Sequence, residues 1–219
     1  MTIEFQAWPK TPRLFRDIII TEKVNGTNSA IIIEEAGEGG NPDAIAHVYV
    51  DGIVYDVGAQ SRNRLIFPGK ATDNHGFAAF VEHNAEELVK TLGVGRHYGE
   101  WWGDGIQGCY DTTVRGFALF NTEKWQGLHK WLPGPSADRE VLLESVPVLY
   151  EGTFSEAAIN KALFELRDTG SIVSPFDSAE GIVIFHTQSR KAYKVTLDAN
   201  DKGKWELGTS SPDPQTPSA

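Results

Sequence analysis

Two apolar runs near the N-terminus are built from residues that favour strands: DIII at residues 17–20 and SAIIIEE at 29–35. They predict strands over residues 18–22 and 29–34. The stretch between them is polar and contains the pair Asn25-Gly26. Because Asn-Gly between β-branched runs is the strongest short-range hairpin signal, the pattern predicts a hairpin that turns at Asn25-Gly26.

A second hairpin is predicted where Asp51-Gly52 separates two runs rich in Val, Tyr and Ile. The segment between the two hairpins, residues 36–44, is polar and rich in glycine. We therefore expect it to be a surface loop.

Helical spacing of apolar residues occurs twice. A first helix is predicted between Asn74, as its cap, and Gly93, as its end. A second is predicted over residues 156–167, with Ser155 as its N-cap and Gly170 just beyond its last turn.

Further strands are expected in the remaining apolar stretches, at 96–102, 114–121, 146–152, 180–186 and 191–197. Strands outnumber helices and do not alternate with them. The pattern thus favours an α+β fold of antiparallel sheets flanked by helices over a doubly wound one. One domain is expected over residues 1–199, followed by a disordered Pro/Ser-rich tail at 200–219.

Composition narrows the class of protein without changing this fold. The chain has 219 residues and a net charge of -10, which argues against a nonspecific nucleic-acid coat but leaves room for a local basic groove. No apolar run is long enough to span a bilayer, and the N-terminus lacks the pattern of a signal peptide. The single cysteine, Cys109, fits a reducing compartment. We expect a cytoplasmic protein with no membrane partner, in the host cell if a phage encodes it.

Lys23 beside a predicted turn is, by itself, more often a solvated surface lysine than a nucleophile. Five later stretches change its interpretation. The ordered series is EKVNGTN at 22–28, SRNR at 61–64, YGEWWG at 98–103, FALFN at 117–121, EGIVIF at 180–185 and AYKVTL at 192–197. Any one of these motifs is short and weakly predictive, whereas six in order are much stronger.

This series resembles the covalent nucleotidyltransferase superfamily of ATP-dependent ligases and mRNA capping enzymes. Within it the likeness is to RNA ligases of the nick-sealing, phage type, and WPKTPRLF at residues 8–15 looks like their lead-in. The resemblance covers about residues 8–197. It implies a nucleotidyltransferase domain, which is the ATP-grasp-like adenylation domain of ligases.

The resemblance also implies roles for eight residues. It assigns Lys23 and Lys194 to catalysis, Glu22, Asn28, Arg62, Glu100 and Phe120 to binding the nucleotide cofactor, and Glu180 to a metal ion. Arg64 is the reserve for Arg62. Three of these assignments have a plainer explanation: a surface arginine pair for Arg62, a strand-end glutamate beside core tryptophans for Glu100, and a core phenylalanine for Phe120.

Two positions depart from the family pattern. Asn121 stands where the family usually has Asp, and Thr196 stands where related enzymes often have a second lysine. The role of Asn121 and part of the catalytic electrostatics around the phosphate are therefore open.

The chemistry of these residues agrees with the resemblance. A lysine amine attacks the α-phosphate of a nucleoside triphosphate only in its uncharged form, which a nearby cation or partial burial favours. Bound Mg²⁺ or Mn²⁺ and Lys194 would supply that cation. We therefore expect an ATP-dependent polynucleotide ligase that forms a lysyl-AMP intermediate and joins 5′-phosphate to 3′-hydroxyl ends.

RNA is the expected substrate, with DNA nicks as the second choice. The same motifs are compatible with a GMP-transferring, capping-like enzyme and with a non-enzymatic nucleic-acid-binding relative. Larger members of the superfamily have a second domain after the last lysine motif, and only 22 residues follow Leu197. We expect a monomer, unless a partner supplies the second domain.

Overall fold

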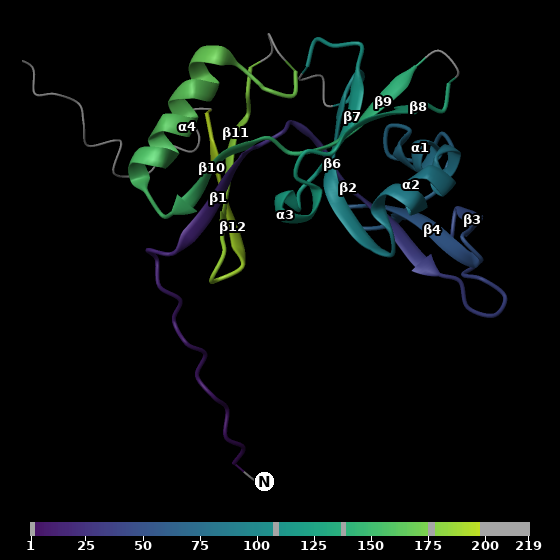
Figure 1. Cartoon of the computed structure of the whole chain (residues 1–219), viewed down its shortest axis with the longest axis horizontal. Helices are drawn as coiled ribbons and strands as arrows, with labels where there is room; N and C mark the ends of the chain where they lie inside the picture. The colour runs from purple at the N-terminus through teal and green to yellow at the C-terminus, as the bar shows by residue number, and fades with distance from the viewer. Residues whose placement is uncertain (1–2, 107–109, 137–138, 175–177, 198–219) are drawn as a thin grey trace, which may run out of the picture.

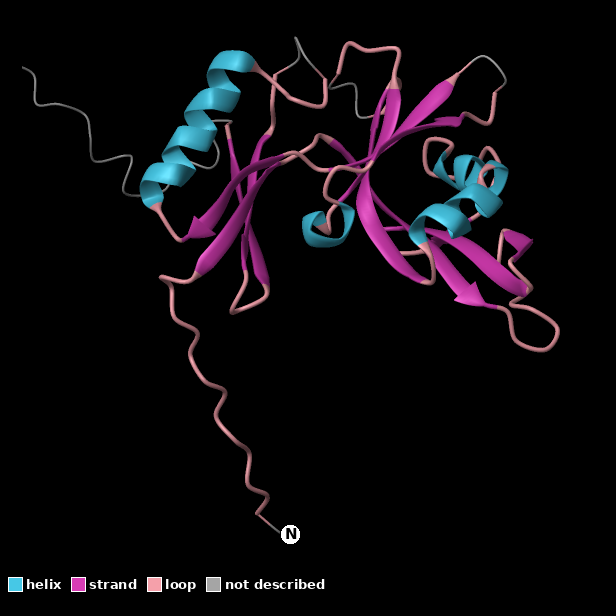
Figure 2. Ribbon diagram, viewed as in Figure 1, coloured by secondary structure: helices cyan, strands magenta, loops and turns pink. Residues whose placement is uncertain are grey.

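Two β-sheets, each with its own hydrophobic core, form the architecture of the computed structural model (Figure 1). The structure describes residues 3–106, 110–136, 139–174 and 178–197, so Cys109 and the predicted tail at 200–219 lie outside the described residues. Strands predominate and helices do not alternate with them (Figure 2), which confirms the predicted α+β class. None of the helices in the described ranges is long and apolar enough to cross a bilayer.

The first sheet has the strand order β10–β1–β11–β12 and is antiparallel throughout. Ile18 and Ile20 alternate along β1 and point to the same face, where they share a core with Leu166 of the long helix α4. The bounds are β1 Asp17–Glu22, β10 Val148–Thr153, α4 Glu156–Thr169, β11 Gly181–His186 and β12 Lys191–Thr196.

The second sheet has the order β3–β4–β2–β6–β7–β9–β8, with β5 paired to β4. Its larger core lies under helices α1 and α2, where Phe77 and Phe80 pack against Trp101. The strands are β2 Gly26–Glu35, β3 Ala46–Val50, β4 Ile53–Ser61, β5 Leu65–Ile66, β6 Gly95–Gly103, β7 Arg115–Leu119, β8 His129–Pro133 and β9 Glu140–Ser145. The helices are α1 Phe77–His83, α2 Ala85–Leu92 and α3 Thr122–Trp125.

The hairpin predicted at Asn25-Gly26 is wrong, although both strands exist. β1 pairs with β10 and β11, whereas β2 pairs with β4 and β6, so the two strands belong to different sheets. The reason is that each strand has a separate core to join: Ile18 packs under α4, and Ile31 packs under α1 and α2. Residues 23–25 are therefore a crossover between the two sheets.

The hairpin predicted at Asp51-Gly52 is confirmed. β3 and β4 are antiparallel and Val50 pairs with Ile53. Asp51 and Gly52 have φ values of 50° and 88°. Two consecutive positive φ angles match the twist of a two-residue hairpin.

The predicted helix between Asn74 and Gly93 is two helices. Asn84 interrupts it, because its side-chain amide donates to Phe80 O at 2.9 Å and to Pro133 O at 2.8 Å. Asp73, rather than Asn74, caps the start: its carboxylate accepts from the backbone N–H groups of Ala78 and Ala79.

The second predicted helix is confirmed as α4. Ser155 accepts from Ala158 N at 3.2 Å, and Gly170 follows its last residue with φ 84°. The short helix α3, the strands β5, β8 and β9, and the parallel pairing of β7 with β9 were not predicted from the residue pattern.

Gly26 stands at the start of β2, where the crossover enters the second sheet. A Cβ atom there would lie 2.3 Å from the carbonyl oxygen of Trp101 on β6. Glycine is therefore required for close backbone approach.

Replacing Gly26 by alanine should lower the free energy of unfolding by about 1–3 kcal/mol, because the new methyl group meets backbone that cannot move aside. Gly37→Ala is the matched control, since a Cβ at Gly37 meets nothing within 4 Å. Urea unfolding of both variants checks this. Equal midpoints for Gly26→Ala and the wild type would contradict it.

Candidate active site

Lys23 lies directly after β1, at the first position of the crossover. Its backbone N–H donates to Gly181 O at 2.8 Å, which fixes it beside the start of β11. Its Nζ forms an ion pair with Oε1 of Glu180, the residue before β11. The two side chains are 23% and 28% exposed, so a solute can reach the amine.

A row of polar side chains on the second sheet lies beside Lys23. Asn28 pairs with Glu100 across β2 and β6, and its amide Nδ2 donates to Glu100 Oε2 at 2.5 Å. Arg62 follows Ser61, the last residue of β4, which pairs with Ser29. The register thus places Arg62 next to Asn28 at the same end of the sheet.

The electrostatics of Glu100 tie these groups together. Burial raises the pKa of Glu100 to about 7. The hydrogen bond from Asn28 and the charges of Lys23 and Arg62 lower it, while the charge of Glu180 raises it further. The predicted residues Lys23, Asn28, Arg62 and Glu180 therefore all interact with Glu100.

Lys194 and Thr196 lie on the neighbouring edge strand. In the register of β11 and β12, Thr196 pairs with Gly181 and Lys194 pairs with Val183. Both belong to one face of the strand, because side chains alternate. Lys194 is exposed, and Thr196 lies across Gly181 from the backbone of Lys23.

Phe120 follows β7 and continues its pairing with β6. Its N–H donates to Tyr98 O at 3.0 Å, and its ring is 44% exposed. Ala118 pairs with Glu100, so alternation puts Phe120 on the same face of the sheet as Glu100. An exposed ring at that place can stack on a nucleobase.

The neighbouring Asn121 has a local role, because its side chain caps α3 by accepting a hydrogen bond from Lys124 N.

The structure does not bring Glu22 to this group. Its side chain points to the opposite face of β1 from Lys23 and is 1% exposed. It accepts hydrogen bonds from Ser171 Oγ at 2.5 Å and Ile172 N at 2.9 Å. Burial raises its pKa, and these hydrogen bonds lower it. Glu22 thus anchors the segment after α4.

The reserve residue Arg64 also has a local partner, because its side chain donates a hydrogen bond to Thr72 O at 3.2 Å.

Tyr110 was not among the predicted site residues. It fixes the second end of the crossover, at Asn25. The backbone N–H of Asn25 donates to the Tyr110 hydroxyl at 3.0 Å. Burial raises the pKa of Tyr110 to about 12, and Ser171, the partner of Glu22, also hydrogen-bonds to it. The residues on both sides of Lys23 are therefore held by one buried polar cluster. The motif series gave no signal for Tyr110, because the contact joins segments 85 residues apart.

Glu144 on β9 is a partly buried carboxylate outside the predicted set, and its Oε2 atom lies 3.9 Å from His129 Nδ1. It pairs with Ala118 in the row that contains Glu100. Burial, and to a lesser extent the charge of Glu22, raises its pKa to about 7. Its Oε1 atom has no hydrogen-bond partner within the described residues.

Metal ligands from the chain are few. No group of three His, Cys, Asp or Glu side chains that could hold an ion occurs among the described residues. Glu180 beside Glu100 fits an ion that takes one or two carboxylates and completes its shell with water and phosphate oxygens, as Mg²⁺ does.

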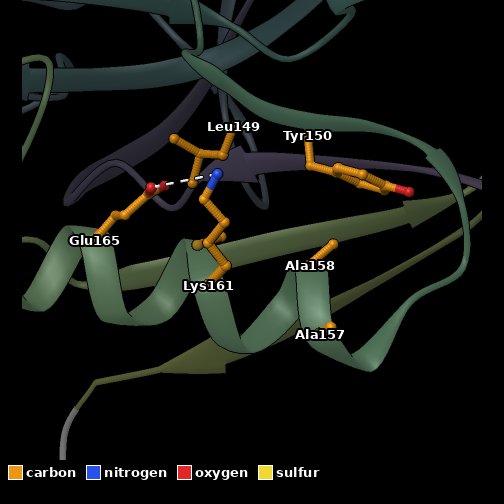
Figure 3. A pocket seen from close by; sticks show the side chains of 7 residues that line it. Leu149, Tyr150, Ala157, Ala158, Lys161 and Glu165 are labelled. Atoms are coloured by element: carbon orange, nitrogen blue, oxygen red, sulfur yellow. Dashed lines mark ion pairs between the residues drawn. The ribbon is translucent and has the colours of Figure 1, made fainter.

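A surface hollow lies elsewhere, between β10 and α4 (Figure 3). Its lining is mostly apolar and includes Leu149, Tyr150 and Ala158, with the pair Lys161 and Glu165 at its edge. None of the predicted site residues lines it.

Glu144→Gln should make stability less dependent on pH. The pKa of Glu144 rises from 4.5 to about 7 on folding, so the folded protein holds a proton that the unfolded chain releases in that interval. The wild type therefore loses stability as pH rises through this range. The free energy of unfolding of the variant relative to the wild type should be greater at pH 8 than at pH 5, by on the order of 1–3 kcal/mol. Denaturant titrations at the two pH values measure it, and an equal difference at both would count against the assignment.

The sequence and the fold were compared with those of known proteins. The sequence profile of the RNA ligase family matches residues 16–197. A search of curated proteins finds no significant match. Two solved structures of the Naegleria gruberi RNA ligase, a glutamate-to-alanine and an arginine-to-alanine mutant, each with ATP and Mn, have the same fold. Both give a TM-score of 0.50, at 16% and 15% identity respectively.

These structures correspond to 85% of the present chain and to 51% of their own. The chain thus spans about half the length of the Naegleria ligase, and the likeness is one of fold. Because the family profile covers most of the chain, from β1 to the end of β12, the protein belongs to the RNA ligase family.

Proposed function

We propose that the protein is an ATP-dependent polynucleotide ligase that acts on RNA through a covalent lysyl-AMP intermediate. The observation that carries the proposal is the accessible Lys23 amine, which is paired with Glu180 and, like Arg62, lies within electrostatic range of Glu100. A nucleophile, a carboxylate and a planar cation at one place are suited to a nucleotide and its phosphates. The Naegleria ligase structures, which contain ATP and Mn, support the same class of cofactor.

In the first step, the Lys23 ammonium loses a proton to solvent, its Nζ attacks the α-phosphorus of ATP, and the nitrogen loses a second proton to solvent as the phosphoramidate forms. A P–N bond forms, the bond to the β-phosphate oxygen breaks, and pyrophosphate leaves. Lys194 stabilises the charge on the α-phosphate. Glu100 and Asn28 hold the ribose side of the nucleotide, and the exposed ring of Phe120 stacks on the adenine.

Two further transfers complete the reaction. An oxygen of the RNA 5′-phosphate attacks the AMP phosphorus, the lysine nitrogen takes a proton from solvent, and the P–N bond breaks to return the free lysine amine. A 3′-hydroxyl then attacks the 5′-phosphate phosphorus, loses its proton to solvent and displaces AMP. Arg62 is suited to bind the 5′-phosphate, because its guanidinium presents a planar fork to phosphate oxygens.

A divalent ion held by Glu180 would neutralise charge on the transferring phosphate. Glu180 also pairs with the Lys23 ammonium. The carboxylate thus has two competing partners, and engaging one of them releases the other.

A non-enzymatic relative that binds nucleic acid is the second candidate function. Thr196 favours it, because this residue takes the place of a second lysine beside the start of β11. A DNA-sealing or GMP-transferring enzyme is a variant of the first proposal.

The proposed function predicts that the wild type, incubated with α-labelled ATP and Mg²⁺ or Mn²⁺, retains label through denaturation. Lys23→Ala should reduce the label to background, because no amine remains at the site. Lys161→Ala on α4 is the control, since that side chain is 74% exposed and lies away from the site. Replacing ATP by GTP, and RNA nicks by DNA nicks, separates the related enzymes.

Equal labelling of the wild type and Lys23→Ala would reject Lys23 as the nucleophile. Absence of label from the wild type with both nucleotides would favour the non-enzymatic relative.

A further inference from the structure

An N-terminal arm, residues 3–16, extends away from the first sheet (Figures 1 and 2). Ile3, Phe5 and Trp8 are each more than 90% exposed. Pro9 and Pro12 keep the arm out of a helix, because proline fixes φ and lacks an N–H group. An extended arm that presents bulky apolar side chains to solvent is typical of a segment that binds a partner.

The root of the arm is fixed to the body. Arg13 N donates to Gln188 Oε1 at 2.9 Å, and His186 Nε2 lies 3.0 Å from Leu14 O. The ring of Phe15 packs edge-on against Phe154 at 5.8 Å. The arm therefore leaves the protein at a defined place, beside the turn that joins β11 to β12.

The arm and the β11–β12 turn are rich in cations, although the chain has a net charge of -10 and Asp17 lies beside Thr187 at the root of the arm. The arm and residues 187–191 together carry five cationic side chains and a single carboxylate, Glu4; the cations are Lys10, Arg13, Arg16, Arg190 and Lys191. None of the five forms an ion pair within the described parts of the chain. Their charge is thus available to a polyanion.

The edge strand β12 leads from this cation-rich turn toward the candidate site. Lys191 starts the strand at the root of the arm, and Thr196 ends it across Gly181 from Lys23. Between them lie Tyr193, which is 55% exposed, and the exposed Lys194, on opposite faces of this edge strand. The strand covers about 17 Å.

Exposed aromatic rings among cations are the pattern that binds single-stranded nucleic acid, because rings stack on bases and cations contact phosphates. An apolar protein partner would use the rings and leave the cations without a role. We propose that the arm and β12 bind a single strand of RNA and lead its end to Lys23. This proposal rests on the proposed function for the identity of the strand.

The test is the affinity of a fluorescent single-stranded RNA with a 5′-phosphate, measured by anisotropy over a range of salt concentrations. The double variant Phe5→Ala, Trp8→Ala should weaken binding at least about tenfold, because it removes two stacking rings. The double variant Lys10→Ala, Arg13→Ala should lower the slope of log K against log salt concentration by about 1.4.

Lys161→Ala, Phe164→Ala on α4 is the matched control, since it removes an exposed cation and an aromatic ring that is 68% exposed, away from the arm. Its RNA affinity should equal that of the wild type. Thermal unfolding of all variants should also be unchanged, because the altered side chains have few contacts.

Equal RNA affinity in the wild type and both arm variants would overturn the proposal. Loss of self-association in the arm variants at unchanged RNA affinity, seen by sedimentation, would assign the arm to a second copy of the chain instead. Labelling of the wild type by ATP is measured separately without RNA. Its failure would reject the proposed function and leave the RNA-binding result to be judged by itself.

Discussion

The geometry of the candidate active site depends on the crossover at residues 23–25, where the chain leaves one sheet and enters the other. Lys23 N–H bonds to Gly181 O on the first sheet, and Asn25 N–H bonds to the Tyr110 hydroxyl. Gly26 then enters the second sheet so close to Trp101 that only glycine fits. These three backbone constraints, at Lys23, Asn25 and Gly26, fix the path of the crossover. The Lys23 amine is thus held where Glu180 of one sheet approaches Glu100 of the other.

The protein also contains three carboxyl groups that are buried or partly buried. Glu22, Glu100 and Glu144 all have pKa values raised by burial. Burying a carboxylate costs free energy, because the charge loses its water. Hydrogen bonds from Ser171 and Ile172 offset this cost at Glu22, and the hydrogen bond from Asn28 offsets it at Glu100. An unpaired buried carboxylate is destabilising unless it is protonated or gains a cationic partner. A group of this kind is common where a protein holds charged ligands.

Local features of the fold could be predicted from the sequence, but the pairing of strands could not. The Asp51-Gly52 turn and the Ser155 cap of α4 involve residues a few positions apart, so local chemistry decides them. The Asn25-Gly26 signal failed because two separate cores compete for the flanking strands. For the site, the motif series predicted five side chains that the structure groups together. It could not tell that Glu22 alternates to the opposite face, nor that Tyr110 lies beneath the crossover.

The most direct measurement of the central claim is the location of the nucleotide on the chain. The protein is incubated with ATP and Mn²⁺, digested under conditions that preserve a phosphoramidate, and sequenced by tandem mass spectrometry. AMP on Lys23, and on no other lysine, is the predicted result, because the crossover presents this amine beside Glu180 and Glu100. AMP on a different residue, or spread over several exposed lysines, would contradict the account.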